Sequence, residues 1–194
     1  MRGVESRGNK VWNWRILAAS MALSAGMLVG TTGIALAQEA TGPVPNPVST
    51  VVKNQLARFQ KNMVGGAEAM PAEKYGFKPT ADMSSYGHLI MHITQTNYSL
   101  CSKLSGGTAP DVKLADTDPK DKLVTALKAS FDYCTTSLAT ADDAKLGEQV
   151  QLFGPKPVPR AAAWLGLYGS WNDHYSTQAV YLRLSGILPP SAQH

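Results

Sequence analysis

The stretch that most constrains the fold lies near the C-terminus, between Ala163 and Pro190. Large apolar and aromatic residues recur there at alternating steps of four and three, the spacing of one face of an α-helix. Ser185-Gly186 then supplies a glycine for the left-handed turn that closes a helix, and Pro189-Pro190 prevents a restart. We therefore predict a long helix whose buried stripe consists of Trp164, Tyr168, Trp171, Tyr175, Gln178 and Leu182.

A second helical pattern opens the folded part of the chain. Apolar residues from Val52 onward recur at steps of four, three and four. Ser49 or Thr50 is expected to cap this helix, because their side-chain oxygens can accept a hydrogen bond from the first turn. Gly65-Gly66 is expected to end or kink it.

Two more helices are expected between these ends. One runs from near residue 83 to Leu104. The other opens with Asp118 as its cap and Pro119 in its first turn, a favoured place for proline. The final helix begins near Arg160, after a proline-rich loop. With no convincing strand periodicity, the pattern predicts an all-α fold, an up-down four-helix bundle that can carry one long crossover connection.

Residues 1–37 have the features of a secretory signal peptide. Four basic residues precede or open an uncharged stretch, which closes on Ala35-Leu36-Ala37, an Ala-x-Ala cleavage pattern. An uncleaved membrane anchor is the alternative, since the apolar run approaches spanning length. We expect cleavage before Gln38, a proline-rich linker over residues 38–48, and a domain over residues 49–194. The mature protein is then periplasmic or secreted, with no membrane attachment.

The charge of the mature chain gives no case for nucleic acid binding. The leader holds four of the 18 basic and one of the 14 acidic residues, so 14 bases and 13 acids remain, a formal charge of +1. Because a nucleic-acid surface needs an excess of clustered basic residues, this class of partner is excluded.

The mature chain has two cysteines, Cys101 near the end of the second helix and Cys134 late in the third. An even pair in an exported protein favours a disulfide, which would join these two helices. The alternative is a pair of buried thiols that act as small apolar side chains.

Two blocks of sequence share a pattern with a known family. Residues 85–93 are SYGHLIMHI, preceded by YGFKP at residues 75–79, and residues 174–190 are HYSTQAVYLRLSGILPP. The second block is similar to the family pattern His-Tyr-Gly-Gln/Asn, Tyr-Leu-Arg, Gly-Ile-Val-Pro-Pro. The sequence therefore resembles the DinB-like family of four-helix bundles, many of which hold a metal ion on three histidines.

This resemblance implies a metal site at specific positions of the chain. His92 falls at the ligand position of the second helix and His174 at the last ligand position of the final helix, while the middle position falls on Ser170, a poor ligand. His88, one turn from His92, is a further ligand candidate. The implied metal is a divalent ion, zinc or nickel, held by a ligand set that lacks one histidine.

Two functions from different classes remain open. The favoured one is a degenerate member of this metal-dependent family, acting as a small-molecule-binding or structural module. In that case His92, His174, Trp171, Tyr175 and Tyr181 form a polar-aromatic pocket or part of the core. The alternative is a metal-dependent transferase or hydrolase that activates a thiol or water on a histidine-bound ion. A homodimer formed through exposed bundle faces is open in either case.

Overall fold

The computed structural model describes residues 42–193, so the expected signal peptide, its cleavage site and the start of the linker lie outside the described residues. Four helices make up most of the described chain: α1 (Pro47–Ala69), α2 (Tyr86–Ser105), α3 (Lys120–Leu138) and α4 (Arg160–Leu184). A two-stranded antiparallel ribbon, β1 (Gln149–Val150) and β2 (Val158–Pro159), precedes α4. In this part of the chain, no helix is both long and apolar enough to cross a membrane.

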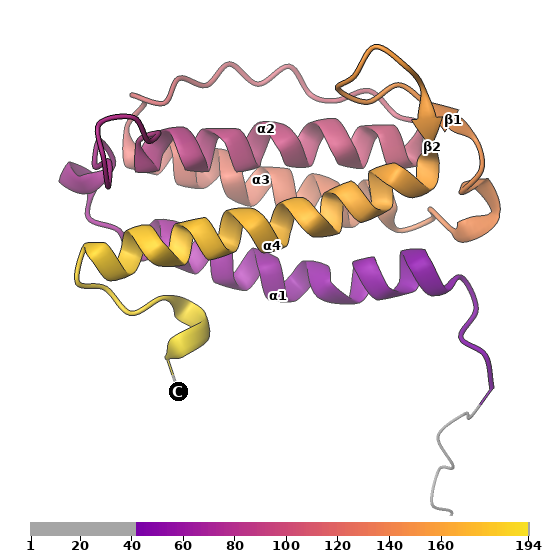
Figure 1. Cartoon of the computed structure of the whole chain (residues 1–194), viewed down its shortest axis with the longest axis horizontal. Helices are drawn as coiled ribbons and strands as arrows, with labels where there is room; N and C mark the ends of the chain where they lie inside the picture. The colour runs from indigo at the N-terminus through magenta and orange to yellow at the C-terminus, as the bar shows by residue number, and fades with distance from the viewer. Residues whose placement is uncertain (1–41, 194) are drawn as a thin grey trace, which may run out of the picture. The chain divides into compact units, whose positions relative to one another are not determined.

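The helices form a bundle in which α2 and α3 are parallel neighbours. Asn97 bonds to Ser130, and one turn further along both helices Cys101 bonds to Cys134. The segment 106–119 makes this possible by running back along the bundle from the end of α2 to the start of α3 (Figure 1). The expected all-α four-helix bundle is confirmed, and the crossover that the sequence left open lies here.

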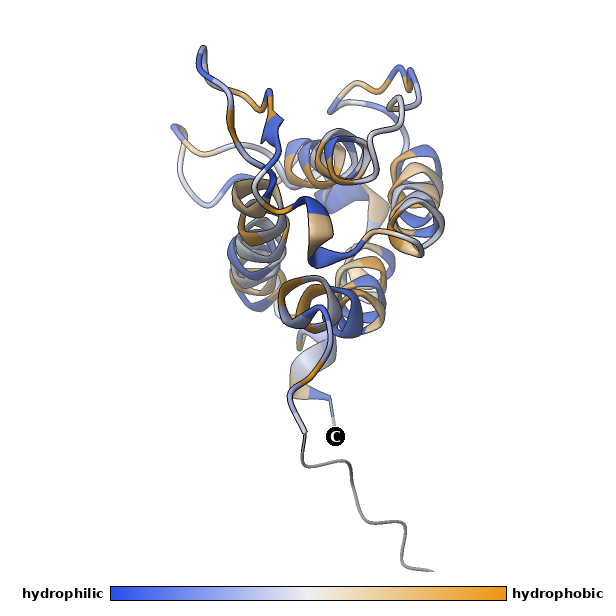
Figure 2. Ribbon diagram, turned by 90° about the vertical axis from the view of Figure 1, so that its right-hand side faces the viewer, coloured by the Kyte–Doolittle hydropathy of each residue, from blue (hydrophilic) through white to orange (hydrophobic). Residues whose placement is uncertain are grey.

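Each helix packs against two of the others. α3 and α4 both contact α1 and α2, which places α1 diagonally opposite α2. Figure 2, viewed nearly along the helices, shows the four of them surrounding one centre. The expected stripe of α4 faces that centre, with Tyr168 and Tyr175 half-buried at its edge. The largest fully buried side chains are Trp164, Trp171, Tyr86, Tyr181, Phe59, Phe131, Met63 and Met70.

An end of the first helix at Gly65-Gly66 is wrong, because α1 continues to Ala69. Gln178 of α4 is fully buried, and its Nε2 donates to the carbonyl of Met63 and to the hydroxyl of Tyr86. A Cβ on Gly66 would lie 2.9 Å from the Gln178 side chain. The missing side chain of Gly66 therefore leaves room for the buried Gln178 side chain to reach the backbone of α1. A glycine inside a helix costs about 1 kcal/mol of stability relative to alanine.

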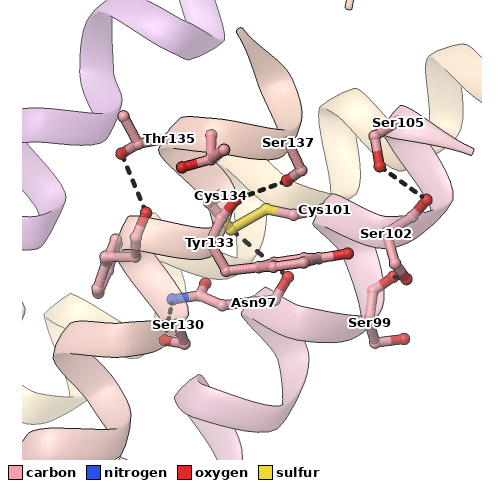
Figure 3. Close-up of a disulfide and its surroundings, with 12 residues drawn as sticks. Asn97, Ser99, Cys101, Ser102, Ser105, Ser130, Tyr133, Cys134, Thr135 and Ser137 are labelled. Atoms are coloured by element: carbon pink, nitrogen blue, oxygen red, sulfur yellow. Dashed lines mark hydrogen bonds between the residues drawn. A yellow bond between two sulfur atoms is a disulfide. The ribbon is translucent and has the colours of Figure 1, made fainter. Parts of the chain in front are cut away.

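The disulfide expected between α2 and α3 is present. Cys101 and Cys134 are both fully buried and joined, with a sequence separation of 33 residues. Figure 3 shows the bond beside the contact of Asn97 with Ser130, so the parallel pair is held by a covalent and a hydrogen-bonded contact.

Two expected helix caps differ from the structure. Asp118 lies one residue before the cap position of α3, which is Pro119, and its carboxylate accepts from Ala115 N and Lys122 Nζ. At α1 the cap position is Asn46, with no side-chain cap, and Pro47 occupies the first turn. Pro47 and Val48, expected in the linker, therefore belong to the helix.

Two free backbone N–H groups in the first turn of α1 form hydrogen bonds with a residue that is distant in the sequence. Val48 N and Ser49 N donate to the two carboxylate oxygens of Asp143, at 2.9 and 2.8 Å. Partial burial raises the pKa of this carboxyl, but the hydrogen bonds of Ser49 and Val48 and the charge of Lys53 outweigh it and leave the pKa below its usual value. A carboxylate at a helix N-terminus is also favoured by the helix dipole.

We predict that Asp143→Ala lowers the free energy of unfolding by about 1 kcal/mol at pH 7, as loss of a helix cap does. The pKa of Asp143 is lower in the folded protein than its unfolded value of 3.8. The stabilisation by the Asp143 carboxylate is therefore complete at a pH above 3.8 and is lost as the pH falls through the folded-state pKa. Urea unfolding of both proteins between pH 7 and pH 2 measures this. A difference that persists unchanged at pH 2 would contradict an ionic cap.

Candidate functional site

The two sequence blocks meet in a pocket between the first half of α2 and the second half of α4. Its volume is about 330 Å³, and it is lined by Met83, Ser84, His88, Leu89, His92, His174, Thr177 and Tyr181. Larger surface grooves, of about 670 and 470 Å³, lie between α1 and α3 and beneath the crossover segment. Histidines line neither of those two grooves. The histidine pocket is therefore the candidate site.

His92 and His174 meet in this pocket from opposite helices. Their ring centroids are 4.8 Å apart and the rings are inclined by 74°, an edge-to-face contact. His92 is exposed, whereas His174 is half-buried. The structure thus brings together the two histidines that the family resemblance singled out.

The ring of His174 is held by Ser170. The Ser170 Oγ lies 2.9 Å from Nδ1 of His174, one helical turn along α4. Burial lowers the pKa of His174 and the nearby His92 lowers it further, while Asp173 and the backbone of Ser170 act in the opposite direction and only partly offset this. Because the net pKa lies below the usual value of 6.5, His174 is a neutral imidazole at pH 7.

His88 faces both the pocket and the crossover segment. Its ring is parallel to that of His92, with centroids 6.3 Å apart. Its Nδ1 lies 3.7 Å from Oδ2 of Asp116, and both side chains are about two-fifths exposed, at 41% and 45%. A contact this exposed contributes little to stability, but it places a carboxylate beside the pocket.

Asp116 reaches this position because Gly87 has no side chain. Gly87 N donates to the carbonyl of Tyr75 at 2.8 Å, and a Cβ on Gly87 would overlap the carbonyl oxygen of Asp116. The glycine of the SYGHLIMHI block therefore lets two loops, at Tyr75 and at Asp116, close on the start of α2.

We predict that Gly87→Ala lowers the free energy of unfolding by about 1–3 kcal/mol, the usual range for overpacking, because the Asp116 backbone must move. The His88 ring should then show shifted NMR resonances as Asp116 withdraws. Gly166→Ala in α4 is the matched control, since nothing lies within 4 Å of its added methyl group. That control should be neutral or slightly stabilising. If Gly87→Ala is as stable as the wild-type protein, the crossover segment at Asp116 moves aside without loss of free energy.

The three metal ligands that are typical of the family do not come together in this pocket. The middle ligand position is occupied by Ser170, whose hydroxyl contacts Nδ1 of His174. Within residues 42–193, no three or more His, Cys, Asp and Glu side chains are grouped so as to hold a metal ion, and His88 does not complete a trio with His92 and His174. The residues present therefore do not supply the three protein ligands that a catalytic zinc site takes.

The expected aromatic lining is only partly correct. Tyr181 lines the pocket and its hydroxyl donates to the carbonyl of Ser84 at 2.6 Å. Trp171 belongs to the core instead, where it is fully buried and its Nε1 donates to Asn97 Oδ1. Tyr175 accepts from Ser191 N and does not line the pocket.

Sequence reasoning missed four lining residues. Thr177 and Leu89 lie three residues from His174 and His92, so helical spacing could have found them. Met83 and Ser84 precede α2 in a loop, where no periodicity shows which way a side chain points.

Comparison with known proteins agrees with this fold. The structure is similar to a DinB-like protein from Bacillus subtilis, with 19% identity, a TM-score of 0.60, and coverage of 74% of this chain and 99% of that one. A DinB-like protein from Bacillus cereus is 15% identical, with a TM-score of 0.58 and coverage of 72% of this chain and 93% of that one. A conserved protein from Enterococcus faecalis is 17% identical, with a TM-score of 0.54 and coverage of 70% of this chain and 95% of that one. No protein of curated function matches the sequence.

The family profile described as the DinB superfamily matches residues 55–175, which include His88, His92 and His174. The matched range spans well over half of the chain and begins in α1 and ends in α4. The protein is a member of the DinB superfamily, one in which serine occupies a position where the family resemblance predicts a histidine.

Proposed function

We propose that this protein is an exported binding module that holds a small ligand in the pocket between α2 and α4. The observation that carries the proposal is the contact of Ser170 Oγ with His174 Nδ1, at 2.9 Å. At the position where a third ligand is expected, the chain has a residue that orients a neighbouring imidazole. This arrangement supports a binding role over three-histidine metal catalysis.

The lining of the pocket suits a small molecule with an apolar body and one polar group. Leu89, Met83 and the ring of Tyr181 supply apolar surface, and the imidazoles of His92 and His174 supply hydrogen-bonding nitrogens. The volume of about 330 Å³ lies at the lower end of the range for small-ligand pockets. Because Nδ1 of His174 contacts Ser170, Nε2 is the His174 nitrogen left for a ligand, and the tautomer of the ring decides whether it donates or accepts.

A ligand-observed NMR screen of small polar fragments against residues 38–194, made without a histidine tag, tests the proposal. We expect fragments to bind the wild-type protein and not the His92→Ala/His174→Ala variant. The metal content of both proteins is measured in parallel. Fragments that bind both proteins equally, or none at all, would overturn the binding role.

A divalent-metal-dependent transferase or hydrolase is the second candidate, favoured by the 4.8 Å approach of the His92 and His174 rings. A zinc or nickel ion would there supply Lewis-acid activation of a thiol or of water. Near-stoichiometric zinc or nickel in the wild-type protein, lost in the double variant, would favour this candidate.

Export is part of the proposal and rests on the sequence of residues 1–37. The buried Cys101–Cys134 disulfide supports it, since disulfides persist outside the reducing cytosol. Amino-terminal sequencing of the protein recovered from the periplasm or medium should begin at Gln38. Recovery of an intact residue 1 in the membrane fraction would indicate an anchor instead.

A further inference from the structure

We propose that the groove beneath the crossover segment binds an uncharged mono- or disaccharide. The groove lies between the second half of α2 and residues 107–112, and its volume is about 470 Å³. Small-ligand sites have volumes of roughly 300–1,000 Å³, so this one has room for a sugar. The groove shares no lining residue with the histidine pocket, and the inference therefore does not depend on the proposed function.

The floor of the groove is a row of neutral polar side chains on α2. Gln95, Ser99 and Ser102 follow one another at steps of four and three, which places them on one face of the helix. Tyr98 lies beside this row and is only 7% exposed. The Ser102 hydroxyl donates to the carbonyl of Ser99, whereas the side chains of Gln95, Tyr98 and Ser99 form no hydrogen bond with any other residue in the range 42–193. These three side chains are therefore available to a ligand.

The chemistry of these groups suits a neutral ligand with many hydroxyls. Serine and tyrosine hydroxyls and the glutamine amide can each donate and accept, as can every hydroxyl of a sugar. The two charged lining residues, Lys103 and Asp111, have opposite signs, and Asp111 is paired with Lys113 at 2.7 Å. The groove thus lacks the clustered charge of one sign that would attract phosphate or a polyanion.

The opposite wall of the groove is held in place by Tyr133 of α3. The Tyr133 hydroxyl donates to the carbonyl of Thr108 at 3.1 Å, and its ring packs edge to face against Tyr98, with centroids 5.4 Å apart. Figure 3 shows Tyr133 reaching from α3 toward the side of α2 that carries Ser99 and Ser102. Burial raises the pKa of Tyr98, and the charge of Asp132 raises it further, so the phenol stays a neutral donor at pH 7.

Two further restraints act on the crossover segment. Val112 N donates to the carbonyl of Pro110 at 3.1 Å, and the proline ring fixes its own backbone. The Cys101–Cys134 disulfide closes the loop that contains the whole crossover segment. The groove is therefore formed without a ligand, and a sugar can bind without the entropy loss of ordering a loop.

NMR titration of the isotope-labelled mature protein, residues 38–194, with glucose, N-acetylglucosamine and maltose tests the inference. We expect at least one of these sugars to bind with a dissociation constant on the order of 1 mM, because each hydrogen bond in a groove open to water contributes little net free energy. Backbone amides of residues 95–103 and 107–112 should shift, and those near His92 and His174 should not. Glycine, a zwitterion, and inorganic phosphate, an anion, should cause no such shifts.

Two variants separate recognition by side chains from a general effect of sugar on the protein. Gln95→Ala/Ser99→Ala should weaken binding about tenfold or more, and Tyr98→Phe about three- to tenfold, the usual effect of one hydrogen bond. Alanine is the best helix former, so the double variant should remain folded. Thr96→Ala is the matched control, because Thr96 is a half-buried residue of the same helix that does not line the groove.

The inference is overturned if none of the three sugars binds, if the shifts lie outside the groove, or if the double variant binds as tightly as wild type. Equal shifts with glycine or phosphate would also overturn it, since charge would then govern binding. The His92→Ala/His174→Ala variant should bind sugar as wild type does. Failure of this inference is thereby distinguished from failure of the proposed function, which concerns the histidine pocket.

Discussion

Replacement of both Cys101 and Cys134 by alanine should lower the free energy of unfolding by about 3–4 kcal/mol. The disulfide closes a loop with a sequence separation of 33 residues, which contains the whole crossover segment between two parallel helices. Closing a loop of this length removes conformational entropy from the unfolded chain. No short hairpin connection restrains α2 and α3, so the covalent link is the strongest restraint on their pairing.

Urea unfolding measures this loss, and the thermal midpoint should fall by roughly 10 °C. The internal control is the wild-type protein unfolded in the presence of a reductant. Both sulfurs are fully buried, so the native disulfide should resist reduction until the chain opens, after which refolding should match the alanine variant. A loss below 1 kcal/mol would mean that the hydrogen bond of Asn97 with Ser130 and the surrounding apolar contacts suffice to hold the pair.

The helices could be predicted because each depends on local spacing. The buried stripe of α4 and its start at Arg160 follow from residues within one or two turns of each other. Features that depend on distant residues could not be predicted in this way. Asp143 caps α1 from 94 residues away, and the role of Gly66 depends on Gln178.

In the candidate site, too, residues on helices could be predicted from local spacing and residues in loops could not. His92 and His174 were found through motifs carried on helices, and the structure brings them together. Asp116 and Met83 lie in loops, where sequence spacing does not show the direction of a side chain. Ser170 was identified as a missing ligand, but its contact with His174 became apparent only from the folded helix.

Ser170→His should create a zinc or nickel site and raise the affinity for these ions by about 100-fold or more, equivalent to roughly 3 kcal/mol. Residues 170 and 174 lie one turn apart on α4, and their side chains already touch at 2.9 Å. His174 in turn meets His92 of α2. An imidazole at position 170 would therefore complete a set of three protein ligands with an open fourth position.

Competition with a zinc-binding dye measures the gain, and Ser176→His is the matched control. Ser176 is exposed on the same helix and does not line the pocket, so its histidine variant should bind zinc no better than wild type. Addition of His92→Ala to Ser170→His should abolish the gain, because the site then loses its contribution from α2. If Ser170→His binds zinc no better than wild type, position 170 does not face a metal-competent pocket. The proposed function assumes that Ser170 orients His174 at the position where a third metal ligand would lie, and this assumption would then fail.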